Sequence, residues 1–292
     1  MSRFADSFSG HSILVADGAT GTQLQKAGLP AGTAPESWNL DNPTAIRTLH
    51  SSYKDAGANI VLTNTFGGSR IKLNRNHLGE KVVEINRRAA ELAREVMKDD
   101  GLVFGDMGPT GELLEPLGSL SFEQAVTAFS EQAAALAKGG ADAILIETMS
   151  DLSEARAAIE GAKQACDLPV IVTLSFDTHG RTMMGVKPST AMQELWPLGL
   201  AAIGGNCGRS LTDTLAAIEA MHQANPRAVL MAKPNAGLPH SKDGQTVYEV
   251  TPEVMAEYAL KFKDAGIKIF GGCCGSTPDH IQAVAKALRT AG

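Results

Sequence analysis

The sequence has 292 residues, of which 43% are hydrophobic and 20% charged, and its formal net charge at pH 7 is −6. This composition is that of an ordinary globular protein with a substantial core, and the negative charge argues against a nucleic-acid partner, because phosphate binding needs a basic surface. No run of about 18 apolar residues and no stretch suited to a signal peptide occurs, so we expect a cytoplasmic protein that does not enter a membrane.

Eight short apolar runs rich in Ile, Val and Leu recur along the chain, each ending in glycine or polar residues. They do not alternate with polar residues, which is typical of strands that are buried on both faces of a parallel sheet. The expected strands lie within residues 13–18, 59–68, 102–111, 143–150, 169–177, 201–208, 228–237 and 267–275.

Helical patterns separate these runs, and several begin with Ser, Thr or Pro and end in Ala-Gly or Gly-Gly. Strands that alternate with helices predict βαβ units, and eight such units predict a closed (β/α)8 TIM barrel. No linker breaks the pattern, so residues 1–292 are interpreted as one domain, although the first strand or two are expected to be distorted. The expected helices lie within residues 43–58, 80–100, 121–141, 152–165, 211–224, 251–267 and 277–291.

Three of the four cysteines follow two of the expected strands. Cys207 ends the sixth strand in GGNCG, and Cys273 and Cys274 end the eighth strand in GGCCG. Active sites of this fold lie at the carboxyl ends of the strands, so the three thiols are expected to converge on one rim. Three thiolates with one open position are typical of a catalytic zinc site, and we predict Zn²⁺ bound by Cys207, Cys273 and Cys274.

Two other interpretations of these cysteines stay open. Free cysteine often packs as a small hydrophobic residue, and this is the expected role of Cys166, which follows a helix before Asp167, Leu168 and Pro169. A disulfide between the neighbours Cys273 and Cys274 is the second alternative, although it would be strained and unusual in a reducing compartment.

The motifs around the cysteines carry a specific resemblance. GGNCG and GGCCGSTPDHI, together with DGATGTQL near the start and LTNTFGGS at the second strand, resemble the homocysteine S-methyltransferase family over residues 12–290. That family includes betaine-dependent and S-methylmethionine-dependent enzymes and the homocysteine module of cobalamin-dependent methionine synthase. The resemblance implies a zinc-bearing barrel that methylates homocysteine to methionine, with Cys207, Cys273 and Cys274 as the zinc ligands.

The chemistry of the thiols agrees with that implication. A free thiol has a pKa of about 8.5 and is mostly protonated at neutral pH, whereas a thiol bound to zinc is deprotonated. The substrate thiol would occupy the open position and attack a methyl group directly. We therefore assign no catalytic serine, histidine or lysine beyond the zinc site.

An amino-acid substrate also needs its ammonium and carboxylate held. Asp17 and Glu147 end the first and fourth strands and suit the ammonium, and by resemblance they match the homocysteine-binding acids of the family. The backbone amides of Gly18, Ala19 and Thr20 lead into a helix and suit the carboxylate. For Asp17 the alternative is a helix-capping role, whereas an unpaired buried carboxylate at Glu147 would be costly.

Four further strand-end residues could bind substrate or support other groups by hydrogen bonds. Asn64 and Asn206 are predicted to bind the substrate. Asp106 and Asn235 carry the same two alternatives.

The methyl donor is open between betaine, S-methylmethionine and a methylcorrinoid or methylfolate system. A quaternary or sulfonium donor would favour aromatic faces nearby, and Trp38 and Phe66 lie on expected rim loops. Gly67 stands where the betaine branch carries a tyrosine, which weakens a betaine assignment. A methylcorrinoid on a separate protein would instead need an exposed docking rim.

Two other classes of function compete with methyl transfer. A Schiff-base aldolase could use Lys233 at the end of the seventh strand, with the GGCCGS amides binding a phosphate. The three thiols would then have no role. The chain could also be a non-catalytic thiol-binding subunit of a multiprotein methyl-transfer system.

Overall fold

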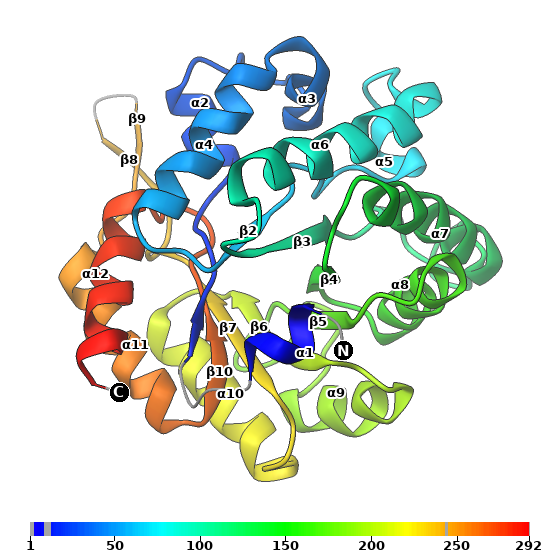
Figure 1. The fold of residues 1–292 in the computed structure, drawn as a ribbon. Coiled ribbons are helices and arrows are strands. Elements are labelled where there is room, and N and C mark those ends of the chain that lie inside the picture. The colour runs from blue at the N-terminus through cyan, green and yellow to red at the C-terminus, as the bar shows by residue number, and fades with distance from the viewer. Residues whose placement is uncertain (1–2, 9–12, 243–244, 292) are drawn as a thin grey trace.

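The computed structural model describes residues 3–8, 13–242 and 245–291, and its centre is an eight-stranded parallel sheet surrounded by helices (Figure 1). An isolated bridge between Ala16 and Ile60 joins the two end strands of the sheet, which closes the barrel. The predicted (β/α)8 barrel is confirmed. Its strands are β1 (Leu14–Val15), β2 (Ile60–Leu62), β3 (Leu102–Met107), β4 (Ala143–Met149), β5 (Val170–Leu174), β6 (Ala202–Cys207), β7 (Leu230–Pro234) and β10 (Ile267–Phe270), hydrogen-bonded in the order β1-β10-β7-β6-β5-β4-β3-β2.

Each strand lies inside one of the predicted apolar runs. β1 and β2 are short, with two and three residues, which agrees with the expected distortion at the start of the barrel. The short helix α1 (Arg3–Ser7) precedes them, in a segment that gave no sequence signal. Residues 9–12 lie outside the described part of the chain.

The seven predicted helices are present, with ends that differ by up to three residues from the expected ones. They are α4 (Pro43–Asp55), α6 (Val82–Met97), α7 (Phe122–Lys138), α8 (Leu152–Ala165), α10 (Leu211–Ala224), α11 (Pro252–Asp264) and α12 (Pro278–Thr290). Short elements in the connections were not predicted. These are α2 (Gly21–Lys26), α3 (Trp38–Asp41), α5 (Arg70–Asn74), α9 (Pro188–Leu195), the 3₁₀ turns Pro35–Ser37, Gly79–Lys81 and Trp196–Leu198, and a hairpin of β8 (His240–Lys242) and β9 (Gln245–Val247).

Side-chain alternation along the strands divides the barrel interior into two parts. One buried cluster of apolar side chains fills the part of the barrel interior nearer the amino ends of the strands. Because strand side chains point to the same face at every second residue, the residue two positions further along faces the mouth of the barrel. The polar residues found there follow apolar members of the cluster: Asp106 follows Phe104 on β3, Glu147 follows Leu145 on β4, and Lys233 follows Met231 on β7.

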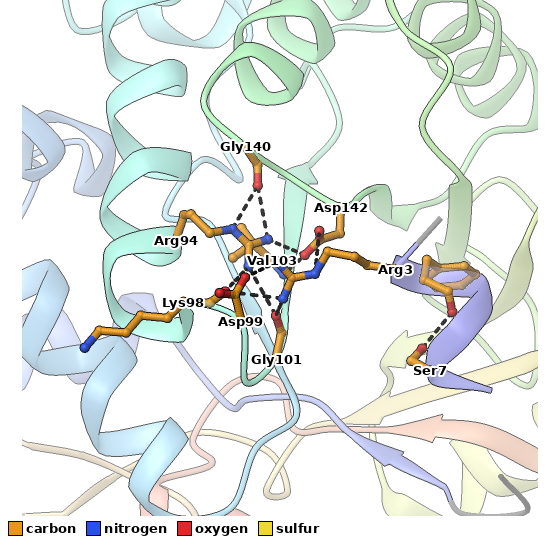
Figure 2. Close-up of polar contacts among 10 residues, drawn as sticks. Arg3, Ser7, Arg94, Lys98, Asp99, Gly101, Val103, Gly140 and Asp142 are labelled. Carbon is orange, nitrogen blue, oxygen red and sulfur yellow. Dashed lines mark hydrogen bonds and ion pairs between the residues drawn. The ribbon is translucent and has the colours of Figure 1, made fainter. Parts of the chain in front are cut away.

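The opposite end of the barrel is closed by α1. The Phe4 ring belongs to the same apolar cluster and lies 5.8 Å from the ring of Phe104. Arg3 and Arg94 converge on Asp142, which directly precedes β4 (Figure 2). Within the described ranges, no helix is long and apolar enough to cross a membrane.

Candidate active site

The three predicted thiols meet at the carboxyl end of the barrel. Cys207 ends β6, Cys273 and Cys274 lie in the loop after β10, and their three Sγ atoms all lie within 4.8 Å of one another. The Sγ atoms of Cys207 and Cys273 are 3.0 Å apart. All four cysteines are free thiols, so the structure contains no disulfide between Cys273 and Cys274, and Cys166 lies outside the cluster. The cluster has the donor set and spacing that a soft metal ion needs.

Backbone geometry aims these thiols at one point. Cys207 adopts φ +57°, a left-handed conformation that non-glycine residues rarely take and that concentrates at functional sites. The amide of Cys273 donates to the carbonyl of Pro234, and the carbonyl of Cys274 accepts from the amide of Ala236. The loop after β10 is thereby attached to the end of β7, which holds two adjacent thiols in place.

The side chain of Asn206 contacts the thiol of Cys207. Its Oδ1 accepts from the amide of Thr148 and from the hydroxyl of Thr173, both at 2.8 Å, so its orientation is determined by β4 and β5. Its Nδ2 donates to Thr148 Oγ1 at 2.6 Å and lies 3.3 Å from the Sγ of Cys207. The side chain predicted to bind substrate therefore contacts a thiol and fixes its surroundings.

Hydrogen bonds within the cluster make its three thiols unequal. Bonds from Cys207 and Cys273 lower the pKa of Cys274 to about 3. Bonds with Cys273 and Cys274, followed by burial, raise the pKa of Cys207 well above its usual value. One proton therefore leaves the cluster easily, whereas full deprotonation needs a cation.

A buried ion pair lies in the barrel mouth. Lys233 Nζ is 3.1 Å from Glu147 Oε2, and both side chains are less than 10% exposed. Burial disfavours the charged ammonium, but the carboxylates of Glu147 and Asp17 outweigh it and raise the pKa of Lys233. A Schiff-base nucleophile must be a neutral amine, so this environment argues against the aldolase alternative.

Asp17 lies in the same mouth with one carboxylate oxygen free. Its Oδ2 accepts from the amide of Leu62 at 2.8 Å, while its buried Oδ1 has no partner among the described residues. Burial raises the pKa of Asp17 to about 7, although Lys233 and the Leu62 amide act in the opposite direction. This buried oxygen therefore keeps an unused hydrogen-bond acceptor.

The loop that follows Asp17 approaches the thiol loop closely. The Ala19 amide donates to Ser276 Oγ at 3.1 Å, and the Ala19 carbonyl accepts from the hydroxyl of Tyr53 at 2.8 Å. A Cβ on Gly18 would lie 2.7 Å from Ser276 Oγ, so only glycine fits there. One of the three amides predicted to bind a carboxylate therefore already has an acceptor.

Asn64 lies at the edge of the site. Its Nδ2 donates to the carbonyl of Pro35 at 2.7 Å and to Oδ1 of Asn39 at 3.2 Å. These bonds attach the 3₁₀ turn Pro35–Ser37 and α3 to the end of β2. The side chain thus shapes the wall of the site.

The three thiols, Glu147, Lys233 and Asn64 line one cavity of about 550 Å³. It extends from the three thiols past Glu147 to Gly18 and the segments after β1 and β2, whereas the buried Asp17 is not among its lining residues. Its size is typical of a ligand site. Phe66 lines it and Trp38 does not. The lining residues that the sequence did not single out as site residues include Glu36, Lys72, Asn76 and Thr148.

Comparisons with known proteins agree with this geometry. The sequence profile of the family described as homocysteine S-methyltransferase matches residues 14–288. The methionine synthases of Mycobacterium leprae and Mycobacterium tuberculosis are each 33% identical over 94% of this chain, which spans only 24% of their length. The metallated form of the homocysteine methyltransferase MmuM from Escherichia coli superposes with a TM-score of 0.81 over 96% of this chain and 98% of its own, at 24% identity, which is a likeness of fold.

Proposed function

The chain belongs to the homocysteine S-methyltransferase family, and on that premise we propose that it transfers a methyl group to the sulfur of homocysteine and releases methionine. The observation that carries this proposal is the cluster of three Sγ atoms within 4.8 Å of one another, open to a cavity that is also lined by Glu147 and Lys233. A Schiff-base aldolase would not need such a cluster of thiols. Residues 1–292 are proposed to act as one domain.

We assign Cys207, Cys273 and Cys274 as ligands of a zinc ion. When bound, zinc would lower the pKa of the homocysteine thiol so that the sulfur is a thiolate at neutral pH. The chain's own residues hold the ligands for it: Asn206 orients the Cys207 thiol, and the backbone bonds to Pro234 and Ala236 fix the other two.

The amino-acid part of homocysteine is proposed to bind beside the thiols. Its ammonium would meet the free Oδ1 of Asp17 and the carboxylate of Glu147, the latter already oriented by Lys233. Its carboxylate would meet the amides of Gly18 and Thr20, because the amide of Ala19 is bonded to Ser276. A charge-assisted bond at each end would fix the direction of the sulfur.

The reaction needs no nucleophile from the protein. The substrate sulfur supplies the electron pair, so positioning of the two substrates is the main contribution of the chain. The donor is proposed to be betaine, S-methylmethionine or a methylcorrinoid or methylfolate system, the corrinoid being carried by a separate protein.

Purified protein loaded with zinc tests the proposal. We expect about one zinc per chain and methionine formation from homocysteine with one of these donors. Absence of methionine with every donor, or borohydride trapping of a carbonyl substrate on Lys233, would contradict it.

A further inference from the structure

The loops after β1 and β10 lie side by side, and each carries one end of the proposed substrate site. The two strands pair in parallel, and their backbone bonds continue as far as the amide of Gly272, which donates to the carbonyl of Asp17 at 2.9 Å. Further along, the first loop brings Gly18 and Thr20 to the cavity, and the second brings Cys273. The spacing between these groups therefore depends on contacts outside the sheet.

Ser276 is the main contact between the two loops. Beyond the bond of Gly272, every hydrogen bond between the described parts of these loops, with α2 included, involves Ser276. Its Oγ accepts from the amide of Ala19 at 3.1 Å and donates to the carbonyl of Cys273 at 2.7 Å. Its carbonyl accepts from Nε2 of Gln23 at 3.2 Å. Because Ser276 is fully buried, bulk water does not compete for these bonds.

Tyr53 of α4 contacts the same two loops. Its hydroxyl donates to the carbonyl of Ala19 at 2.8 Å and lies 3.3 Å from the carbonyl of Ser276. Its side chain is fully buried, and burial raises the pKa of Tyr53 well above its usual value, so the hydroxyl remains a donor. A buried polar network whose members are all bonded makes a structure rigid. Tyr53 and Ser276 thus form a polar link between the two loops, the Tyr53–Ser276 link.

Glycines at the contact allow the two loops to approach each other closely. A Cβ on Gly18 would lie 2.7 Å from Ser276 Oγ and 2.8 Å from the hydroxyl of Tyr53, and a Cβ on Gly272 would clash with the same Oγ. Glycine also leaves the backbone more conformational freedom than any other residue. The Tyr53–Ser276 link therefore supplies the fixed spacing that packed side chains provide elsewhere.

We propose that Tyr53 and Ser276 are positioning residues that fix the distance between the thiols and the amides of Gly18 and Thr20, and that this distance selects the chain length of homocysteine. The inference rests on the proposed function, in which the substrate sulfur lies at the thiols and the substrate carboxylate at the two amides. Neither hydroxyl contacts the substrate. Both act through the backbone of the loops that bind it.

A substrate that is held at both ends is selected by its length. Homocysteine has one methylene more than cysteine between its α-carbon and its sulfur. The reach of the two sulfurs differs by about 1 Å, and a misplacement of this size can cost on the order of 10²-fold in rate. A loosened loop would let the shorter chain reach both binding points. Loss of the link should therefore reduce the selection between the two amino acids without removing the metal site.

Calorimetry with two thiols separates the carboxylate end from the sulfur end. In zinc-loaded protein, Tyr53→Phe should raise the Kd of L-homocysteine by roughly 3- to 10-fold, the range for loss of one hydrogen bond. The compound 3-aminopropane-1-thiol is homocysteine without its carboxylate, so its Kd should change by less than about twofold. Tyr258→Phe is the matched control. It removes a hydroxyl that bonds to Thr212 away from the cavity lining, and it should change neither Kd.

L-Cysteine tests the selection of chain length. The wild-type protein should bind L-homocysteine more tightly than L-cysteine, and Tyr53→Phe and Ser276→Ala should each reduce the ratio of the two affinities by roughly 3- to 10-fold. The double variant should reduce it little further, because both changes remove the same link. Ser52→Ala removes a hydroxyl that bonds within α4 and is the control for Ser276→Ala.

Equal weakening of L-homocysteine and 3-aminopropane-1-thiol by Tyr53→Phe would overturn the proposal, as would an affinity ratio that both variants leave unchanged. If Tyr53→Phe does not fold, which circular dichroism would show, Ser276→Ala gives the same readings. The proposed function fails in a different way. If the wild-type protein binds homocysteine but forms no methionine with any donor, methyl transfer is wrong, and the affinity ratios still decide whether the link selects chain length.

Discussion

The two ends of the barrel differ in how their aspartates are paired. At the amino end, Asp142 is only 9% exposed, and it pairs with Arg94 and Arg3 and accepts the amide of Val103 at 2.8 Å (Figure 2). At the carboxyl end, Asp106 is as deeply buried but has no partner for its Oδ1 in the described chain. The difference shows that one aspartate is paired and stabilises the fold, whereas the other keeps an unpartnered oxygen at the wall of the cavity.

The largest expected effect concerns the thiols at the carboxyl end. Cys273→Ala should abolish zinc binding and reduce methyl transfer by about 10³-fold or more, because removal of a metal-bound activating centre costs several kcal/mol of barrier. Metal analysis and circular dichroism would check that the barrel stays folded. Cys166→Ala, which removes a thiol outside the cluster, should keep both metal and activity.

Breaking the buried ion pair should be the most destabilising change in the cavity. Lys233→Met leaves Glu147, Asp17 and Asp106 without their common cation, and we expect a loss of about 3–5 kcal/mol in the free energy of unfolding. Denaturant unfolding would measure it. Lys54→Met, which breaks a pair with the exposed Asp100, should cost about 1 kcal/mol or less, and a similar loss in both variants would contradict the account.

Neutralising the two aspartates should shift stability in opposite directions. Asp142→Asn removes paired charges and should destabilise the protein by about 1–3 kcal/mol, whereas Asp106→Asn should stabilise the ligand-free protein. Thermal unfolding of both variants beside the wild type would show the signs. Destabilisation by Asp106→Asn would mean that Asp106 has a structural partner.

The pH dependence sharpens the same comparison. The pKa of Asp106 is raised in the folded protein, so its ionisation favours unfolding as pH increases above about 4, the value for the unfolded chain. The increase in the free energy of unfolding caused by Asp106→Asn should therefore vanish near pH 4 and grow toward pH 8. A gain that is equal at both pH values would contradict the raised pKa.

A smaller effect is expected for ligand binding at Asp17. Its pKa of about 7 means that the ionised form, which binds an ammonium, falls as pH falls through neutrality. Methionine has no thiol to lose a proton, so its affinity should drop about tenfold from pH 8 to pH 6 through the carboxylate alone. Calorimetry would measure this drop, and Asp17→Asn should flatten it.

The sequence predicted the barrel and the metal-ligand cluster because both leave local signals. The apolar runs mark the strands, and glycine-flanked cysteines at two strand ends must meet on one rim. The pairing inside the mouth leaves no such signal. Lys233 was considered only as a nucleophile, because its partner Glu147 lies 86 positions away and only the closed barrel brings them together.

Side-chain alternation along the strands could have predicted which strand-end residues point into the barrel. Counting every second residue along β3 leads from Phe104 to Asp106 and predicts an inward carboxylate above the apolar layer. Lys72 and Glu36 lie in connections without periodicity, so their place at the cavity follows from tertiary packing alone.

X-ray absorption at the zinc edge tests the central claim, that the carboxyl end of the barrel activates the homocysteine thiol, most directly. We predict three sulfur neighbours around zinc in the protein alone and four when homocysteine saturates the site, because the substrate sulfur joins Cys207, Cys273 and Cys274. A sulfur count that stays at three with bound homocysteine would contradict the account.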